Sequence, residues 1–115
     1  MSAEIAAILD RAADIIKRNG LHKGTFASGA LIGGGAFTDK CCCARGAINM
    51  AANGNNPWET SEAGELAHDA LCKYLGISGR VDQSVADWND DPDRTAEQVI
   101  TALRGAAQAE RERAS

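Results

Sequence analysis

Three consecutive cysteines, Cys41, Cys42 and Cys43, stand between a glycine-rich segment and an apolar run. A thiol in the first turn of a helix is stabilised as the thiolate by the helix dipole and by unpaired backbone N–H groups. Cys41, Cys42 or Cys43 could therefore act as a nucleophile, with His68 as its base and Asn89 or Asp90 as the group that orients the base. The candidate catalytic residues are Cys42, Cys43, His68 and Asn89. The competing interpretation is that one or two of these cysteines pack as small apolar residues.

A second combination of donors suits a metal ion. His68 and Cys72 are four residues apart, which places both on one face of a helix at a spacing that can hold two ligands of zinc. Cys41 and Cys43 would supply two more ligands if the helices meet. Against this hypothesis, the chain has no Cys-x-x-Cys pair, and a buried thiol at the border of an apolar stripe explains Cys72 simply. We therefore expect a protein without a cofactor.

A third group of residues could hold a small ligand. The segment Trp88–Asp90 opens an acidic turn, and Arg45 or Arg94 could pair with its carboxylates. The glycines Gly33–Gly35, followed by a helix N-terminus, could form a nest for an anion, although the pattern of a phosphate-binding P-loop is absent. The candidate ligand-binding residues are Arg45, Trp88, Asn89 and Asp90. The competing interpretation is that the tryptophan fills a gap between helices and that the acids cap a solvated turn.

Helices must position most of these residues, because apolar residues recur at helical spacing along much of the chain. We predict helices over residues 3–19 and 40–53, the second capped by Thr38 or Asp39. A capping box at 56–59 predicts the start of a third, which carries Tyr74 on its apolar face and stops at Gly76. A second capping box, at 95–98, predicts the start of the last. The second and last helices are rich in alanine and should pack closely against the first.

The remaining segments indicate short extended pieces. Five glycines interrupt residues 21–39, and we predict a hairpin that pairs residues 24–27 with 36–38. Another extended piece should end at Trp88. The expected fold class is therefore α+β and mostly α, with about four helices, a small alanine-rich core, and a short β hairpin or three short strands.

Composition and charge exclude several classes of protein. The 115 residues suit one domain, which we expect over 1–109, with a frayed polar tail over 110–115. No apolar run approaches the roughly 18 residues of a membrane span, and the N-terminus lacks an export signal, so we expect a cytoplasmic protein with reduced thiols. Residues 51–115 carry twelve acidic and six basic side chains, which argues against nucleic acid as a partner.

Several short motifs, in this order, resemble those of a known family. They are Ala-Ala-Asp-Ile-Ile, Lys-Gly-Thr-Phe, Cys-Ala-Arg-Gly-Ala-Ile, Trp-Asn-Asp and Arg-Thr-Ala-Glu-Gln-Val-Ile. The chain is similar to small uncharacterised proteins of actinobacteria and their phages that carry a domain of unknown function. The chain departs from the pattern at His22, where the family has an aromatic residue, and in the two cysteines that precede the matching Cys43. The resemblance implies a fold and a source, and no mechanism.

Three functional hypotheses follow from the sequence. The first is a small binding or regulatory protein of an actinobacterium or its phage that acts through a protein partner, because no catalytic constellation is complete. The second is a small-ligand binder or cysteine-dependent enzyme that uses Cys41–Cys43 with the Trp88–Asp90 loop. The third is a zinc-stabilised module that uses His68 and Cys72.

Overall fold

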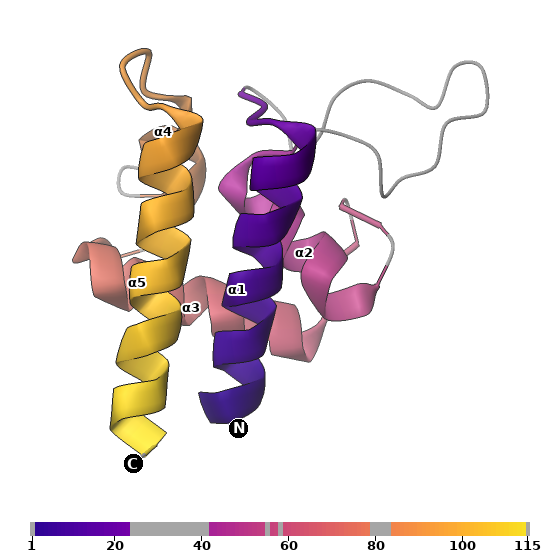
Figure 1. The fold of residues 1–115 in the computed structure, drawn as a ribbon, viewed down its shortest axis with the longest axis vertical. Coiled ribbons are helices and arrows are strands. Elements are labelled where there is room, and N and C mark those ends of the chain that lie inside the picture. The colour runs from indigo at the N-terminus through magenta and orange to yellow at the C-terminus, as the bar shows by residue number, and fades with distance from the viewer. Residues whose placement is uncertain (1, 24–41, 55, 58, 79–83, 115) are drawn as a thin grey trace.

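Two long helices, α1 (Ser2–Asn19) and α5 (Ala96–Ala114), run antiparallel and side by side along the molecule (Figure 1). The start of α1 and the end of α5 therefore lie at the same end. The computed structural model describes residues 2–23, 42–54, 56–57, 59–78 and 84–114. No helix within these ranges is both long enough and apolar enough to cross a membrane.

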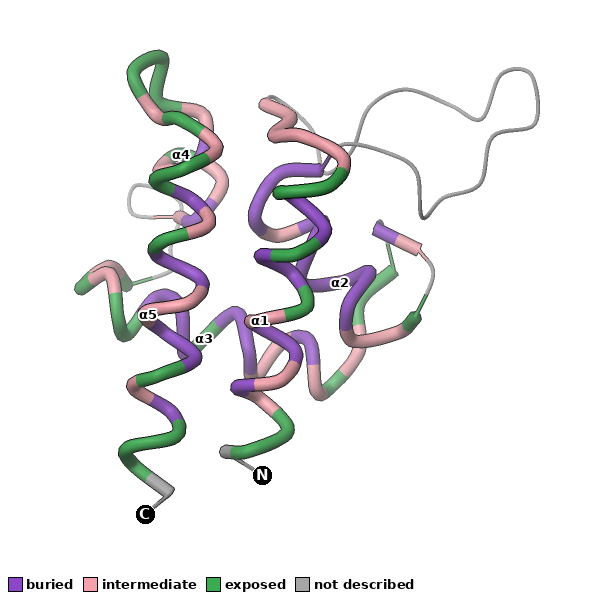
Figure 2. Tube along the Cα trace, in the orientation of Figure 1, coloured by how far each residue is buried: buried purple, intermediate pink, exposed green. Residues whose placement is uncertain are grey.

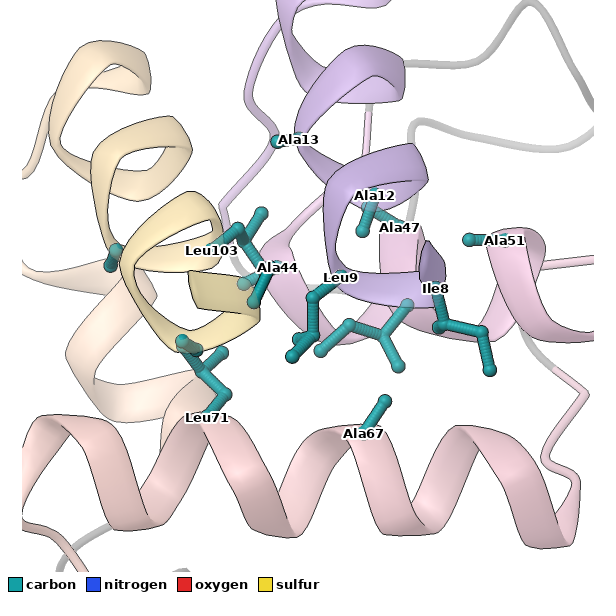
Figure 3. Close-up of a cluster of buried hydrophobic side chains, with 14 of the residues drawn as sticks. Ile8, Leu9, Ala12, Ala13, Ala44, Ala47, Ala51, Ala67, Leu71 and Leu103 are labelled. Atoms are coloured by element: carbon teal, nitrogen blue, oxygen red, sulfur yellow. The ribbon is translucent and has the colours of Figure 1, made fainter. Parts of the chain in front are cut away.

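Three shorter helices pack around this pair. Helix α2 (Ala44–Asn53) packs against α1, and α3 (Glu62–Leu75) runs across both long helices and contacts α2 as well (Figures 1 and 3). Helix α4 (Val85–Asp90) is a short helix before α5 and contacts α2. The prediction that the second and last helices pack against the first is confirmed.

The helix ends follow the signals in the sequence. Gly20, Gly54 and Gly76 have φ values of 97°, 86° and 73°, a left-handed conformation that glycine adopts without strain and that ends α1, α2 and α3 as predicted. The capping box at the start of α5 is also confirmed. The N–H of Gln98 donates to Oγ1 of Thr95 at 3.2 Å, and the N–H of Thr95 donates to Oε1 of Gln98 at 3.0 Å.

The predicted α+β class is wrong. The described residues form five helices and no strand, and their β-type pairing is one isolated parallel bridge between Leu21 and Cys42. The hairpin expected within residues 24–38 lies outside the described residues. A small helical core explains the difference, since the apolar stripes of α1, α2, α3 and α5 cover one another without a sheet.

Serine caps account for two further corrections. The piece expected to be extended up to Trp88 is helix α4, because Oγ of Ser84 accepts a hydrogen bond from the N–H of Asp87 at 3.0 Å. Helix α3 begins after Ser61, whose Oγ accepts from the N–H of Gly64 at 3.1 Å, and not at the capping box expected over 56–59. Each serine stands three residues before the residue whose N–H it caps, which is the usual spacing of an N-cap.

Figure 2 shows buried residues on each of the helices. About half of the buried residues in the core are alanines, and most of the others are larger aliphatic side chains (Figure 3). The largest fully buried aliphatic side chains are Ile8, Leu9, Ile16, Ile48, Leu71, Leu103, Val85 and Val99. Between them, small residues let the helix backbones approach closely. Ala12 and Ala13 of α1 and Ala106 and Ala107 of α5 are each fully buried.

Arginines of α5 join the solvent-exposed side of the same two helices. Arg104 donates to Asp10 at 3.3 Å and to Asp14 at 2.6 Å, and Arg111 also pairs with Asp10. These partly exposed ion pairs fix the register of the helices and contribute little net stability. The close approach of α1 and α5 must therefore come mainly from the fit of the alanines.

Substituting a larger residue in this seam should destabilise the fold. We expect Ala106→Leu to lower the free energy of unfolding by about 1–3 kcal/mol, because the added atoms have no space between the helices. Urea denaturation measures the effect. The matched control is Gln108→Leu, on the exposed face of α5, which should change stability by less than about 0.5 kcal/mol. Equal stability of the two variants would contradict a close-packed seam.

Candidate functional site

The thiol of Cys43 caps helix α2. The backbone of Cys43 is extended, with φ −74° and ψ 172°, and its Sγ accepts a hydrogen bond from the N–H of Gly46 at 3.3 Å. The cap expected at Thr38 or Asp39 is therefore wrong, and the helix starts at Ala44. Sulfur is a weak acceptor, but its position is that of a serine or aspartate at an ordinary N-cap.

Burial determines the chemistry of this thiol. Cys43 is only 3 % exposed, and this desolvation raises its pKa above the ordinary value. Hydrogen bonds from the backbone N–H groups of Gly46 and Arg45 lower the pKa, and the Asp90 carboxylate raises it, but the net shift is upward. The expected activation of a thiol at a helix N-terminus is thus outweighed, and the thiol form is favoured at neutral pH.

The neighbouring Cys42 is also buried, with no exposed surface. Its backbone forms the bridge to Leu21: the N–H of His22 donates to the carbonyl of Cys42 at 2.9 Å, and the N–H of Cys42 donates to the carbonyl of Gly20 at 3.3 Å. Cys41 lies outside the described residues. The two described cysteines of the triplet therefore occupy core and capping positions.

The side-chain amide of Asn89 ties three segments together. Its Oδ1 accepts from the N–H of Ala44 at 2.9 Å, and its Nδ2 donates to the carbonyl of His22 at 3.0 Å and to Oδ1 of Asp90 at 3.1 Å. Asn89 is fully buried. We name this set of hydrogen bonds the Asn89 clasp. It joins α4 to the first residue of α2 and to the segment that follows α1.

The structure thus brings two of the four candidate catalytic residues together and places a third elsewhere. Cys43 and Asn89 meet at the start of α2, where the amide of Asn89 binds backbone groups. His68 lies on α3, and its Nε2 is 3.7 Å from Sγ of Cys72, the contact expected from their four-residue spacing. The described geometry favours structural roles for Cys43 and Asn89.

The His68–Cys72 pair is buried next to charged groups. His68 is 8 % exposed and Cys72 is 5 % exposed. Burial lowers the pKa of His68, and Arg45 lowers it further, while Asp69 and Glu65 raise it less. Burial also raises the pKa of Cys72. Both side chains are therefore favoured in their neutral forms.

One nitrogen of His68 has no hydrogen-bond partner among the described residues. Nδ1 is buried and lies 3.5 Å from Oδ1 of Asp69, beyond normal hydrogen-bond length, so it pairs with this carboxylate only when the ring is protonated. Two metal donors, His68 and Cys72, are in reach of one another, but no group of three His, Cys, Asp or Glu side chains forms among the described residues. The pair alone would leave a zinc ion two ligands short.

The candidate ligand-binding residues point to different neighbours. Arg45 forms an ion pair with Glu65 of α3. Arg94 lies over the ring of Trp88, with its Cζ 4.3 Å from the ring centroid, and its Nε donates to the Trp88 carbonyl at 3.0 Å. The expected pairing of Arg45 and Arg94 with the acids of the Trp88–Asp90 turn is therefore wrong.

A surface groove lies between the end of α3, helix α4 and the first half of α5. Its volume is about 480 Å³. The residues that line it are Tyr74, Leu75, Trp88, Arg94, Glu97, Gln98, Thr101 and Ala102. We call it the Tyr74–Trp88 groove. Tyrosine, tryptophan and arginine are the residue types that dominate binding energy at protein interfaces.

Tyr74 is the residue of this groove that sequence reasoning misplaced. It was expected on the buried face of its helix, but it is 49 % exposed, the one large exposed hydrophobic side chain among the described residues. The sequence contains one signal of its position. Gly105 stands in the middle of α5, and a Cβ there would overlap the hydroxyl group and ring carbons of Tyr74, so the tyrosine ring occupies the space above the glycine.

A second, smaller pocket lies between α1 and the end of α2. Its volume is about 290 Å³, and Ile15, Met50 and Ala51 form its apolar part. Arg11 lines it and donates from Nη2 to the carbonyl of Ala51 at 3.2 Å. This hydrogen bond satisfies a carbonyl in the last turn of α2, which is a structural role for the arginine.

The model of a family of unknown function, DUF6197, matches residues 1–109. No curated protein and no solved structure matches the chain.

Loss of the Asn89 clasp should destabilise the protein. We expect Asn89→Ala to lower the free energy of unfolding by about 2–5 kcal/mol, since it removes the hydrogen bonds to the buried N–H of Ala44 and to the part-buried carbonyl of His22. Urea denaturation measures the change. Asp87→Ala, at an exposed position of the same helix, is the control. A clasp variant within about 0.5 kcal/mol of the control would show that the amide is dispensable.

Protonation of His68 should reduce stability at mildly acidic pH. The pKa is lowered in the folded state, so the unfolded chain takes up the proton first as the pH falls. Stability from this residue is complete above about pH 6.5, the ordinary histidine value, and declines below it by at most about 1.4 kcal/mol per pH unit.

The difference in free energy of unfolding between wild type and His68→Gln isolates this effect, because all other groups titrate in both proteins. Urea denaturation at pH values above and below about 6.5 should give a difference that shifts in favour of the variant as the pH falls. A difference that does not change with pH would mean that His68 is protonated equally in both states.

Proposed function

We propose that this chain, which belongs to the DUF6197 family, is a small binding or regulatory protein that acts through a protein partner. A cytoplasmic location and an actinobacterial or phage source are part of the same proposal. The location is supported by the free cysteines Cys42, Cys43 and Cys72, which suit a compartment where thiols stay reduced, and the source is supported by the resemblance of its motifs.

The observation that carries the proposal is the Tyr74–Trp88 groove. Its walls combine an aromatic ring that is 49 % exposed with a tryptophan and an arginine that hold each other in place. Residues of these types, fixed before binding, lose little conformational freedom when a partner covers them. A groove of about 480 Å³ can accept one or two side chains of a partner.

The described thiols give less support to an enzyme. Cys42, Cys43 and Cys72 are all buried, and burial raises the pKa of both Cys43 and Cys72. A catalytic cysteine usually has a lowered pKa and a partly exposed sulfur. The groove is made of other residues, and its aromatic and polar side chains suit recognition.

Site-specific photocrosslinking tests the proposal. A photoreactive residue in place of Thr101, which is exposed and lines the groove, should give one defined adduct with another protein in cells that encode the chain. The same residue in place of Glu62, at the opposite end of α3, is the control and should not give that adduct.

Removal of the tyrosine should then reduce the adduct. Adding Tyr74→Ala to the Thr101 probe should lower its yield by about tenfold or more, as expected for an aromatic anchor of an interface. Circular dichroism confirms that the variant is folded. The proposal fails if Thr101 gives no protein adduct, or if Glu62 gives the same adducts as Thr101.

A further inference from the structure

The rings of Tyr74 and Trp88 form two aromatic walls of the Tyr74–Trp88 groove. The ring of Tyr74 covers Gly105 so closely that even a methyl group at that position would overlap it. The ring of Trp88 is held by Arg94, which stacks on it and binds its carbonyl. An apolar side chain that enters between these rings would gain contact area, and the Trp88 wall is already ordered before it binds.

Exposed carboxylates that form no ion pair with a described residue stand on the segments beside these walls. Asp87, Asp91, Asp93 and Glu97 are exposed on α4, on the turn after it and in the first turn of α5, and none forms an ion pair with a described residue. Glu97 itself lines the groove. By contrast, the acids Asp10 and Asp14 on α1, which face the other side of α5, are paired with its arginines.

The basic groups near the groove are fewer, and two of them already have partners. Nζ of Lys23 donates to the carbonyl of Asp91 at 2.7 Å, and the guanidinium of Arg94 lies on the ring of Trp88. Lys73 is exposed beside Tyr74 but does not line the groove. Neither contact removes the positive charge of these groups, so the four carboxylates are set against three cations, Lys23, Lys73 and Arg94. The net charge of these seven side chains is negative by one, which favours a cationic partner.

We infer that the Tyr74–Trp88 groove binds a basic segment of the protein partner. An apolar side chain of this segment enters between the two rings, and neighbouring lysine or arginine side chains reach Glu97 and the acids of the turn before α5. The inference rests on the proposed function, since it specifies the chemistry of the partner at the same groove.

Two synthetic peptides provide the first test. Both are amphipathic and have the same leucines, but the polar positions carry lysine in one and glutamate in the other. NMR titration of the labelled protein should show that the lysine peptide shifts the signals of Tyr74, Thr101 and the indole of Trp88 first. The glutamate peptide should leave them unchanged. Equal or stronger binding of the glutamate peptide, or binding of the lysine peptide only elsewhere, overturns the inference, as does no binding.

Charge variants exclude a general attraction between a basic peptide and an acidic protein. Glu97→Gln should weaken binding of the lysine peptide by about two- to fivefold, the range for one exposed ion pair. Glu62→Gln removes an acid at the corresponding place, the first turn of α3, and should leave the affinity unchanged. Equal losses in the two variants overturn the inference. The Gly105→Ala variant, which must displace the ring of Tyr74, should also weaken binding.

The photocrosslinked adduct separates this inference from the proposed function. Mass spectrometry of the adduct formed by the Thr101 probe identifies the partner segment that lies in the groove. The inference is supported if this segment has lysine or arginine beside an apolar residue. The adduct should also be lost when Glu97→Gln is added to the probe and kept when Glu62→Gln is added. An acidic or uncharged segment overturns the inference but leaves a protein partner at the groove. The absence of any adduct overturns both.

Discussion

The fold depends most on the buried amide of Asn89. A helix of six residues such as α4 is too short to be stable alone, and α2 begins at a residue whose N–H is buried. One side chain satisfies the first N–H of α2, the carbonyl of His22 and the carboxylate of Asp90. Without it, α4 would lose its connection to α2, and Trp88, on the same short helix, would not be fixed beside α5.

The alanine-rich core makes such polar connections important. Small side chains bury little apolar area each, so the helices gain less from hydrophobic burial than they would from larger residues. A second buried amide has a comparable role: Nδ2 of Asn49 donates to the carbonyl of Pro57 at 2.9 Å and holds the loop before α3 against α2. Each asparagine fixes backbone that the core alone does not reach.

Local signals made the long helices predictable. The apolar periodicity of α1, the glycines that end α1, α2 and α3, and the Thr95–Gln98 capping box all act within a few residues. The cap at Cys43 and the helix after Ser84 were missed because cysteine is a rare cap and a short helix has too little periodicity. The groove could not be predicted, because it depends on how α3 crosses α5 and on which side of α3 Tyr74 lies.

The contact between Tyr74 and Gly105 links two positions that are far apart in the chain. Glycine in the middle of a helix lowers the stability of the helix. The ring of Tyr74 explains why α5 has a glycine there, because the ring occupies the space that a side chain would need. If either residue is replaced, the other residue no longer has this structural reason to be kept. Among relatives, the two residues should therefore vary together: chains that replace the aromatic side chain are free to restore alanine in α5, and chains that keep the glycine should keep the ring.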